Sequence, residues 1–250
     1  MSLSTASHSH PKASSPLSSD PSDLSNLSYL SYPSDKSDKS DRSDPSDQSD
    51  QSAFDDNSLA LRELSLDRMF PRIRPEDYQL YIARSLEIGR TAAATYLGRP
   101  PRDIAELLKV RIVYFDAELQ GAFAARSEYD SGTQTIALYR YSIAALQARL
   151  NEFGMQTDQT AAADIHIAHE LFHHLEATLL GRVDHRLPSV SVWTCGSFRL
   201  GRAPIRRCRE IAAHKFAKDL LGLPFLPNAL DLMMEVGPKT FYIAELGVCV

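Results

Sequence analysis

Residues 158–181 read DQTAAADIHIAHELFHHLEATLLG and contain the pattern H-E-x-x-H at 169–173. Apolar residues recur through this stretch at helical spacing, and Gly181 is a typical residue to follow a helix. Side chains four residues apart project side by side from a helix, so His169 and His173 can bind one metal ion together. Glu170 can approach a water molecule on that metal without binding the metal, as a general base must. The stretch therefore predicts a helix that presents two ligands and a catalytic base for Zn²⁺.

A catalytic zinc site needs a third protein ligand. An extended H-E-x-x-H-x-x-G-x-x-H motif is excluded, because the chain has Glu176 and Leu179 where that motif needs glycine and histidine. Glu210 is the best candidate, since Ala213 and Ala217 on its own helical face would let a second helix approach the first closely. The alternative ligands are Asp184, His185 and Cys208.

Two histidines are candidates for supporting the chemistry without binding the metal. His214 lies one helical turn after Glu210, where it would hydrogen-bond a metal-bound histidine or the bound water. His214 and His185 are both candidates for stabilising an anionic carbonyl oxygen. A strand over residues 133–138 would pair with an extended substrate at the edge of a sheet.

Residues 59–250 predict an α+β domain. Strand patterns cover residues 111–115, 122–127 and 133–138, and their short connections predict a small antiparallel sheet packed on helices. Helical patterns cover residues 75–97, 104–109, 142–153, 158–180 and 204–221, and residues 226–234 are a further short candidate.

Residues 1–58 differ in composition from the remainder. They hold 20 Ser and 10 Asp against four basic residues, a net charge of 4 − 10 = −6, which leaves (27 − 4) − (32 − 10) = +1 for residues 59–250. A segment with so few apolar residues cannot offset its conformational entropy, so we expect a disordered tail. The near-neutral remainder argues against direct nucleic-acid binding.

The sequence also predicts a cytoplasmic protein. It has no apolar run long enough to cross a membrane and no secretory signal. Its three cysteines include no C-x-x-C pair, as expected in a reducing compartment.

The two motifs together resemble the ImmA/IrrE family of zinc metallopeptidases. That family shows H-E-x-x-H followed by E-x-x-A-N-x-F-A-x-x-L-L; here residues 169–174 read HELFHH and residues 210–221 read EIAAHKFAKDLL, with His214 at the usual Asn position. The resemblance spans residues 75–225 and implies a zincin-like domain of the gluzincin type, with Glu210 as the third zinc ligand. It further implies an endopeptidase that cleaves a protein or peptide substrate such as a helix-turn-helix transcriptional repressor.

Two other functions stay open at this stage. A non-catalytic zinc-containing module for regulation or protein interaction is the main alternative, although a structural zinc site would need no base such as Glu170. The arginines that precede Glu210 form either a basic rim for an acidic peptide or for DNA, or an ordinary solvated segment. They are Arg199, Arg202, Arg206, Arg207 and Arg209.

Overall fold

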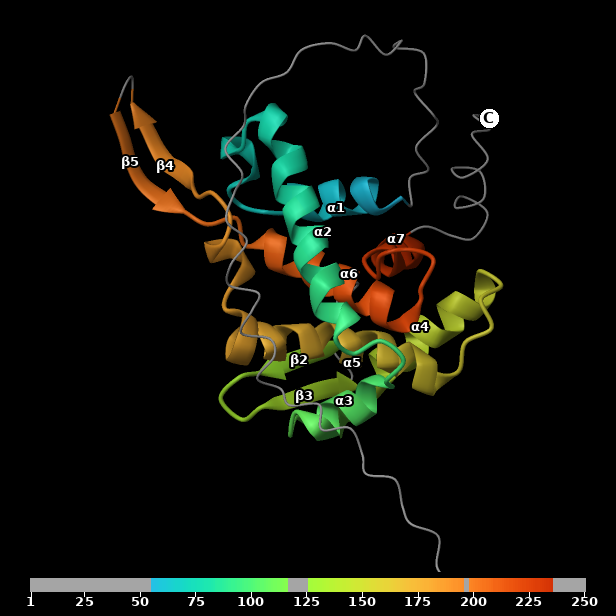
Figure 1. Cartoon of the computed structure of the whole chain (residues 1–250). Coiled ribbons are helices and arrows are strands. Elements are labelled where there is room, and N and C mark those ends of the chain that lie inside the picture. Colours follow the sequence, from blue (N-terminus) through green and yellow to red (C-terminus); the bar gives the residue numbers. More distant parts are fainter. Residues whose placement is uncertain (1–54, 117–125, 196–197, 236–250) are drawn as a thin grey trace, which may run out of the picture. The chain divides into compact units, whose positions relative to one another are not determined.

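The structure is a computed structural model that describes residues 55–116, 126–195 and 198–235 (Figure 1). These residues form the predicted α+β fold, mostly helical with a small sheet. The predicted disordered tail and the C-terminal segment lie largely outside the described residues. The helices are α1 (Asp56–Ser65), α2 (Tyr78–Ala94), α3 (Pro101–Leu107), α4 (Arg140–Glu152), α5 (Gln159–Leu175), α6 (Arg207–Leu221) and α7 (Ala229–Glu235). The strands are β1 (Arg111–Phe115), β2 (Ser127–Asp130), β3 (Thr135–Tyr139), β4 (Val190–Cys195) and β5 (Phe198–Ala203), and short 3-10 or π segments are η2 (Phe70–Arg72), η3 (Pro75–Asp77), η4 (Glu176–Leu180) and η5 (Val183–His185).

Helix α5 carries the H-E-x-x-H motif, as predicted. The side chain of Asp158 accepts a hydrogen bond from the Ala161 amide at 2.7 Å and so caps the start of the helix. The α-helix ends at Leu175 and continues as the π segment η4 until Gly181, whose φ is +70°. The first described helix, α1, begins at Asp56, ahead of the expected boundary between tail and domain at residue 59.

The three-stranded sheet is mixed, so the prediction of an antiparallel sheet is wrong for one of its two pairs. The strand order is β1-β3-β2; β2 pairs antiparallel with β3, but β1 pairs parallel with it. A parallel pair needs a long connection, and the chain between β1 and β3 supplies one that includes β2 itself.

Of the strand predicted at 122–127, residues 122–125 lie outside the described part, and the described strand β2 runs from Ser127 to Asp130. Asp130 ends the strand because its carboxylate accepts bonds from the Gly132 amide and the Thr133 hydroxyl, which close the β2–β3 turn. Because β3 is the central strand, it has no free edge, and the prediction that residues 133–138 pair with a substrate is wrong. The edge strands of this sheet are β1 and β2, and β2 is the one that lies beside α5.

Strands β4 and β5 form a separate antiparallel hairpin within a segment that the sequence did not predict to contain strands. In Figure 1 this hairpin extends away from the helices. It therefore adds nothing to the three-stranded sheet beside α5.

The core centres on α6, which packs against both α2 and α5 (Figure 1). Phe172 of α5 and Phe216 of α6 are fully buried, with ring centroids 5.7 Å apart. On the α2 side, a Cβ added to Gly89 would collide with the carbonyl oxygen of Ala212 and lie 2.9 Å from the Lys215 Cβ. Glycine is therefore what allows α2 to approach α6 this closely.

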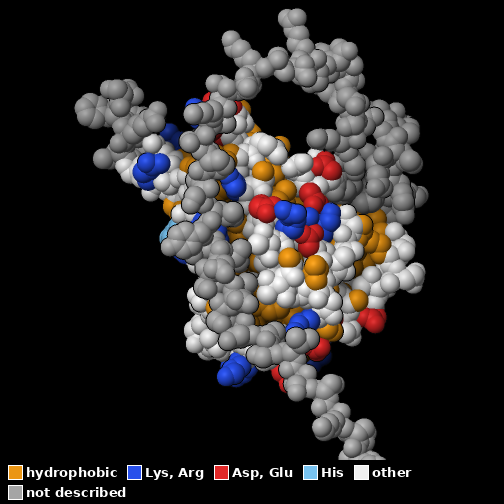
Figure 2. Space-filling model, in the orientation of Figure 1, with side chains coloured by type: hydrophobic (Ala, Val, Ile, Leu, Met, Phe, Trp, Pro, Cys, Tyr) orange, Lys and Arg blue, Asp and Glu red, His pale blue; other side chains and the backbone are white. Residues whose placement is uncertain are grey.

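The surface in Figure 2 carries acidic and basic side chains next to one another near the middle of the face shown. Ion pairs of this kind include Glu87 with Arg90 at 2.6 Å and Asp56 with Lys218 at 2.6 Å. Among the described helices, none combines the length and the apolar character that a membrane span requires.

We expect Gly89→Ala to lower the thermal midpoint by several degrees, because overpacking of this kind costs about 1–3 kcal/mol and exceeds the gain in helix propensity. The matched control is Gly132→Ala, whose Cβ would meet only the movable Asp130 side chain at 3.3 Å. Thermal unfolding followed by circular dichroism measures both. An unchanged or higher midpoint for Gly89→Ala would show that α2 and α6 are not held this closely.

Candidate metal centre

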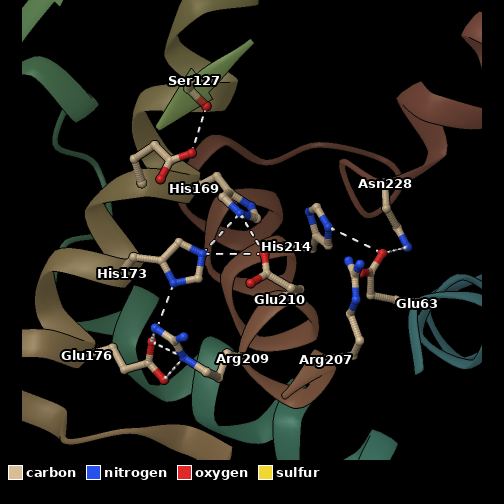
Figure 3. Close-up of polar contacts among 11 residues, drawn as sticks. Glu63, Ser127, His169, His173, Glu176, Arg207, Arg209, Glu210, His214 and Asn228 are labelled. Carbon is tan, nitrogen blue, oxygen red and sulfur yellow. Dashed lines mark hydrogen bonds and ion pairs between the residues drawn. The ribbon is translucent and has the colours of Figure 1, made fainter. Parts of the chain in front are cut away.

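Three side chains from two helices converge on one point. His169 and His173 extend from α5, and Glu210 extends from α6 (Figure 3). The two histidine Nε2 atoms are 3.3 Å apart, and they lie 3.3 Å and 3.4 Å from Oε2 of Glu210. The structure thus brings together the three residues that the sequence predicted as metal ligands, in a nearly equilateral triangle.

The size of this triangle fits a tetrahedral metal ion. In a tetrahedron two ligand atoms lie about 1.63 bond lengths apart, so zinc bonds of about 2.0–2.1 Å require separations of roughly 3.3–3.4 Å. Three corners of such a tetrahedron are supplied by protein atoms, and the fourth is left for water or a substrate. Two imidazole nitrogens and one carboxylate oxygen suit zinc or another transition ion better than Mg²⁺ or Ca²⁺, which prefer oxygen ligands in larger numbers.

A buried carboxylate stands behind His173. Glu176 is 1% exposed, and its Oε2 lies 3.4 Å from His173 Nδ1. Arg209 donates to both oxygens of Glu176 at 2.6–2.8 Å, and the Val183 amide donates to Oε1 at 2.8 Å. Burial alone would raise the pKa of Glu176, but these bonds outweigh it and lower the pKa to about 2. A permanently ionised Glu176 fixes the orientation of the His173 ring and leaves its Nε2 free for a metal.

The ligand cluster itself favours a cation. Burial lowers the pKa of His173, but its bonds to Glu176 and Glu210 prevail and raise that pKa to about 10. Burial would raise the pKa of Glu210, but its contacts with His169 and His173 hold that pKa well below its ordinary value. The surrounding carboxylates therefore stabilise positive charge at the point where the three ligand atoms meet.

Strand β2 lies along α5 and positions the candidate base. The Ser127 hydroxyl donates to Oε1 of Glu170 at 2.7 Å, and Glu170 is only 7% exposed. Two residues further along the strand, the Tyr129 hydroxyl lies 2.8 Å from Nδ1 of His174. Because alternate residues of a strand share a face, both contacts come from the side of β2 that faces α5.

The candidate site borders an open cleft of about 530 Å³. Glu170, His173 and Glu210 border it, together with Tyr129 of the edge strand and Arg209. Two of the three candidate ligands and the candidate base are thus open to a molecule that enters the cleft. An exposed fraction of 31% for the Glu210 side chain agrees with an open coordination position.

The alternative ligands proposed from the sequence do not join the cluster. Within the described residues, His169, His173 and Glu210 form the one group that could hold a metal. Asp184 is fully buried and accepts two bonds from Arg182, at 2.6 Å and 3.0 Å. Cys208 is also buried, and burial raises the pKa of its thiol to about 12, so it stays protonated.

His185 lies in η5 with an exposed side chain, outside the metal cluster, so the structure gives no support to its predicted role beside the metal. The preceding residue, Asp184, points inward, which turns His185 toward solvent.

His214 lies beside the cluster and packs against one of its histidines. Its ring is tilted against that of His169, with centroids 4.6 Å apart, and its Nε2 is 3.8 Å from Oε2 of Glu63 (Figure 3). No hydrogen bond joins it to a ligand within the described residues, and its Nδ1 is buried there without a partner. Burial, together with charge on His169, keeps the pKa of His214 well below its ordinary value. It is therefore a neutral ring that packs on a ligand.

Several supporting residues were not predicted from the sequence. The role of Glu176 could have been predicted, because it lies three residues after His173 within the stretch whose sequence predicts one helix. The role of Ser127 could not, since a single serine in a strand is not distinctive. The sequence suggested either a basic rim or a solvated segment for Arg207 and Arg209. In the structure Arg207 pairs with the buried Glu63 at 2.8 Å, and Arg209 pairs with the buried Glu176 at 2.6 Å.

Comparisons with protein families, with curated protein sequences and with solved structures found no match for this chain.

We expect Glu210→Ala to abolish tight metal binding, because it removes one of three ligand atoms. His214→Ala should weaken binding by no more than about tenfold, since it removes only a packing contact with His169. Zn²⁺ affinity measured by competition with a chelator checks both. Loss of metal in His214→Ala with retention in Glu210→Ala would reverse the two roles.

We expect Glu176→Gln to weaken Zn²⁺ binding by about 10–100-fold, because the neutral amide no longer supports the His173 ring with a negative charge. Glu152→Gln is the control, since Glu152 is an exposed residue of α4 paired with Arg149. Equal affinities of the two variants in the same competition assay would rule out a role for Glu176 at the metal.

Proposed function

We propose that this protein is a zinc-dependent endopeptidase, related to the ImmA/IrrE metallopeptidases, that hydrolyses a peptide bond in a protein substrate. The observation that carries the proposal is the triangle of ligand atoms from His169, His173 and Glu210, with edges of 3.3–3.4 Å. Its size and its donor atoms suit tetrahedral zinc, and a carboxylate that is not a ligand, Glu170, borders the same cleft.

Zinc bound at this site would lower the pKa of a water molecule toward neutrality and polarise the scissile carbonyl group. His169, His173 and Glu210 would hold it, and Glu176 would keep the His173 ring in the orientation that binding requires. These roles agree with the observed bonds of each residue.

Glu170 supplies the acid–base chemistry. The Ser127 hydroxyl occupies Oε1 of Glu170, which leaves Oε2 to accept a proton from water as the water oxygen attacks the carbonyl carbon. Glu170 then delivers this proton to the amide nitrogen, and the carbon–nitrogen bond breaks. A new carboxyl group and a new amine result, and the base returns to its ionised state.

The open cleft suits a protein substrate rather than a small enclosed molecule. The edge strand β2 borders the cleft at Tyr129 and could pair with an extended segment of substrate. Together with the motif resemblance, this supports a protein such as a helix-turn-helix repressor as the substrate. A non-catalytic zinc module would not need a carboxylate such as Glu170, which Ser127 holds beside the candidate ligands.

We expect Glu170→Gln to retain zinc and to lose peptidase activity by about 100-fold or more, because glutamine keeps the shape but cannot accept the proton. Hydrolysis of a peptide library, read by mass spectrometry, measures activity, and metal analysis measures zinc. Glu152→Gln should behave as the unmodified protein. Full activity of Glu170→Gln would refute the mechanism, and absence of bound zinc from the unmodified protein would refute the site.

A further inference from the structure

Two arginines face the cleft beside the metal ligands. Arg182, from the segment after η4, and Arg209, from the first turn of α6, both line it. Their side chains are 45% and 30% exposed, whereas the carboxylates that they contact, Asp184 and Glu176, are 0% and 1% exposed. Each acid therefore lies beneath its arginine, and each guanidinium is turned toward the cleft.

Both guanidinium groups are held in fixed positions. Asp184 accepts from Nε and Nη2 of Arg182 at 3.0 Å and 2.6 Å, and Glu176 accepts from the same two atoms of Arg209 at 2.6–2.8 Å. Such two-point contacts set the plane of a guanidinium group as well as its position. Little side-chain entropy would then be lost when a ligand binds.

The two arginines are also connected to the candidate metal centre, through Glu176. Glu176 contacts His173 and Arg209, and it accepts the amide of Val183, the residue between Arg182 and Asp184. The two pairs are close enough that Arg209 and Glu176 act electrostatically on Arg182, and Asp184 acts on Arg209. One buried carboxylate thus determines where a metal ligand and both cationic groups lie.

A guanidinium group has five N–H donors, and in the described part of the chain each arginine uses only its Nε and Nη2 on its acid. Each arginine, which lines the cleft, therefore keeps three N–H groups for a ligand, two on Nη1 and one on Nη2. Planar pairs of donors of this kind suit a carboxylate. The remaining lining acids, Glu170 and Glu210, belong to the metal centre itself.

We propose that Arg182 and Arg209 form a carboxylate-binding subsite beside the scissile bond, so that the enzyme selects substrates with an acidic side chain or a free C-terminal carboxylate near the cleavage point. This inference rests on the proposed peptidase function and specifies its substrate class. Arg182 is the more exposed of the two and acts as the main specificity residue, while Arg209 also supports Glu176.

The test measures peptide binding to the full-length Glu170→Gln chain, which cannot consume the probes. Three matched hexapeptides serve as probes: one with a central Glu and an amidated end, one with Gln and an amidated end, and one with Gln and a free carboxylate. Dissociation constants come from NMR titration, with and without Zn²⁺. We expect at least one of the two carboxylate-bearing peptides to bind about tenfold more tightly than the neutral peptide. Whether this is the Glu peptide or the peptide with a free C-terminus shows which carboxylate the subsite binds.

Variants assign the effect to Arg182. The double change Arg182→Gln with Asp184→Asn should abolish the preference without leaving a buried unpaired charge, and retained zinc content shows that the site is intact. Arg186→Gln, at an exposed residue outside the cleft lining, should keep the preference.

Equal binding of all three peptides, no binding of any of them, or a preference that survives in the double variant would each overturn the subsite. A preference that requires Zn²⁺ and ignores the double variant would place the carboxylate on the metal instead, which also overturns it. Failure of the peptidase proposal is read separately, from zinc content and hydrolysis by the unmodified chain.

Discussion

The close packing of α6 against α5 is the contact on which the metal centre depends, because each helix carries an incomplete set of ligands. Small residues on α6 make the approach possible: Ala212, Ala213 and Ala217 are all fully buried. Phe172 and Phe216 fill the interface further along. On the other side of α6, Gly89 allows α2 to approach closely as well. The position of Glu210 is thus fixed by packing on two sides, and a ligand that is fixed in this way loses little entropy on binding a metal.

Charge balance explains why the site should attract a cation. A buried carboxylate is costly unless it is paired, and Glu176 meets this requirement through Arg209. Among the residues that the structure describes, Glu210 forms its ion pairs with the imidazoles of His169 and His173, which offset its charge if one of them is protonated. Together with the bond from Glu176, the contact with Glu210 raises the pKa of His173. A metal ion would supply the same positive charge and displace that proton, so we expect metal binding to compete with protonation.

Local sequence spacing predicted the ligands well, because the three residues lie on helices whose periodicity can be read directly. His169 and His173 share a face of α5, and Glu210 lies on a helix whose alanines indicate close packing. The parallel pairing of β1 with β3 could not be predicted in this way, because strand direction depends on how a long connection crosses the sheet. The Ser127–Glu170 bond joins residues far apart in the chain, and nothing near either residue indicates it.

The π segment after α5 joins the candidate metal ligands to the residues of the proposed carboxylate-binding subsite. Insertion of a π turn shifts the register of a helix, and such turns are frequent at functional sites. Here η4 begins at Glu176, shortly after the motif, and ends at Leu180. The next residue, Gly181, has a φ of +70° and a ψ of 164°, which suit glycine far better than other residues. The chain then reverses, so that the Val183 amide returns to Glu176 and Arg182 reaches the cleft. The same turn therefore orients a metal ligand and places the proposed carboxylate-binding group, and a change in its geometry would disturb both together.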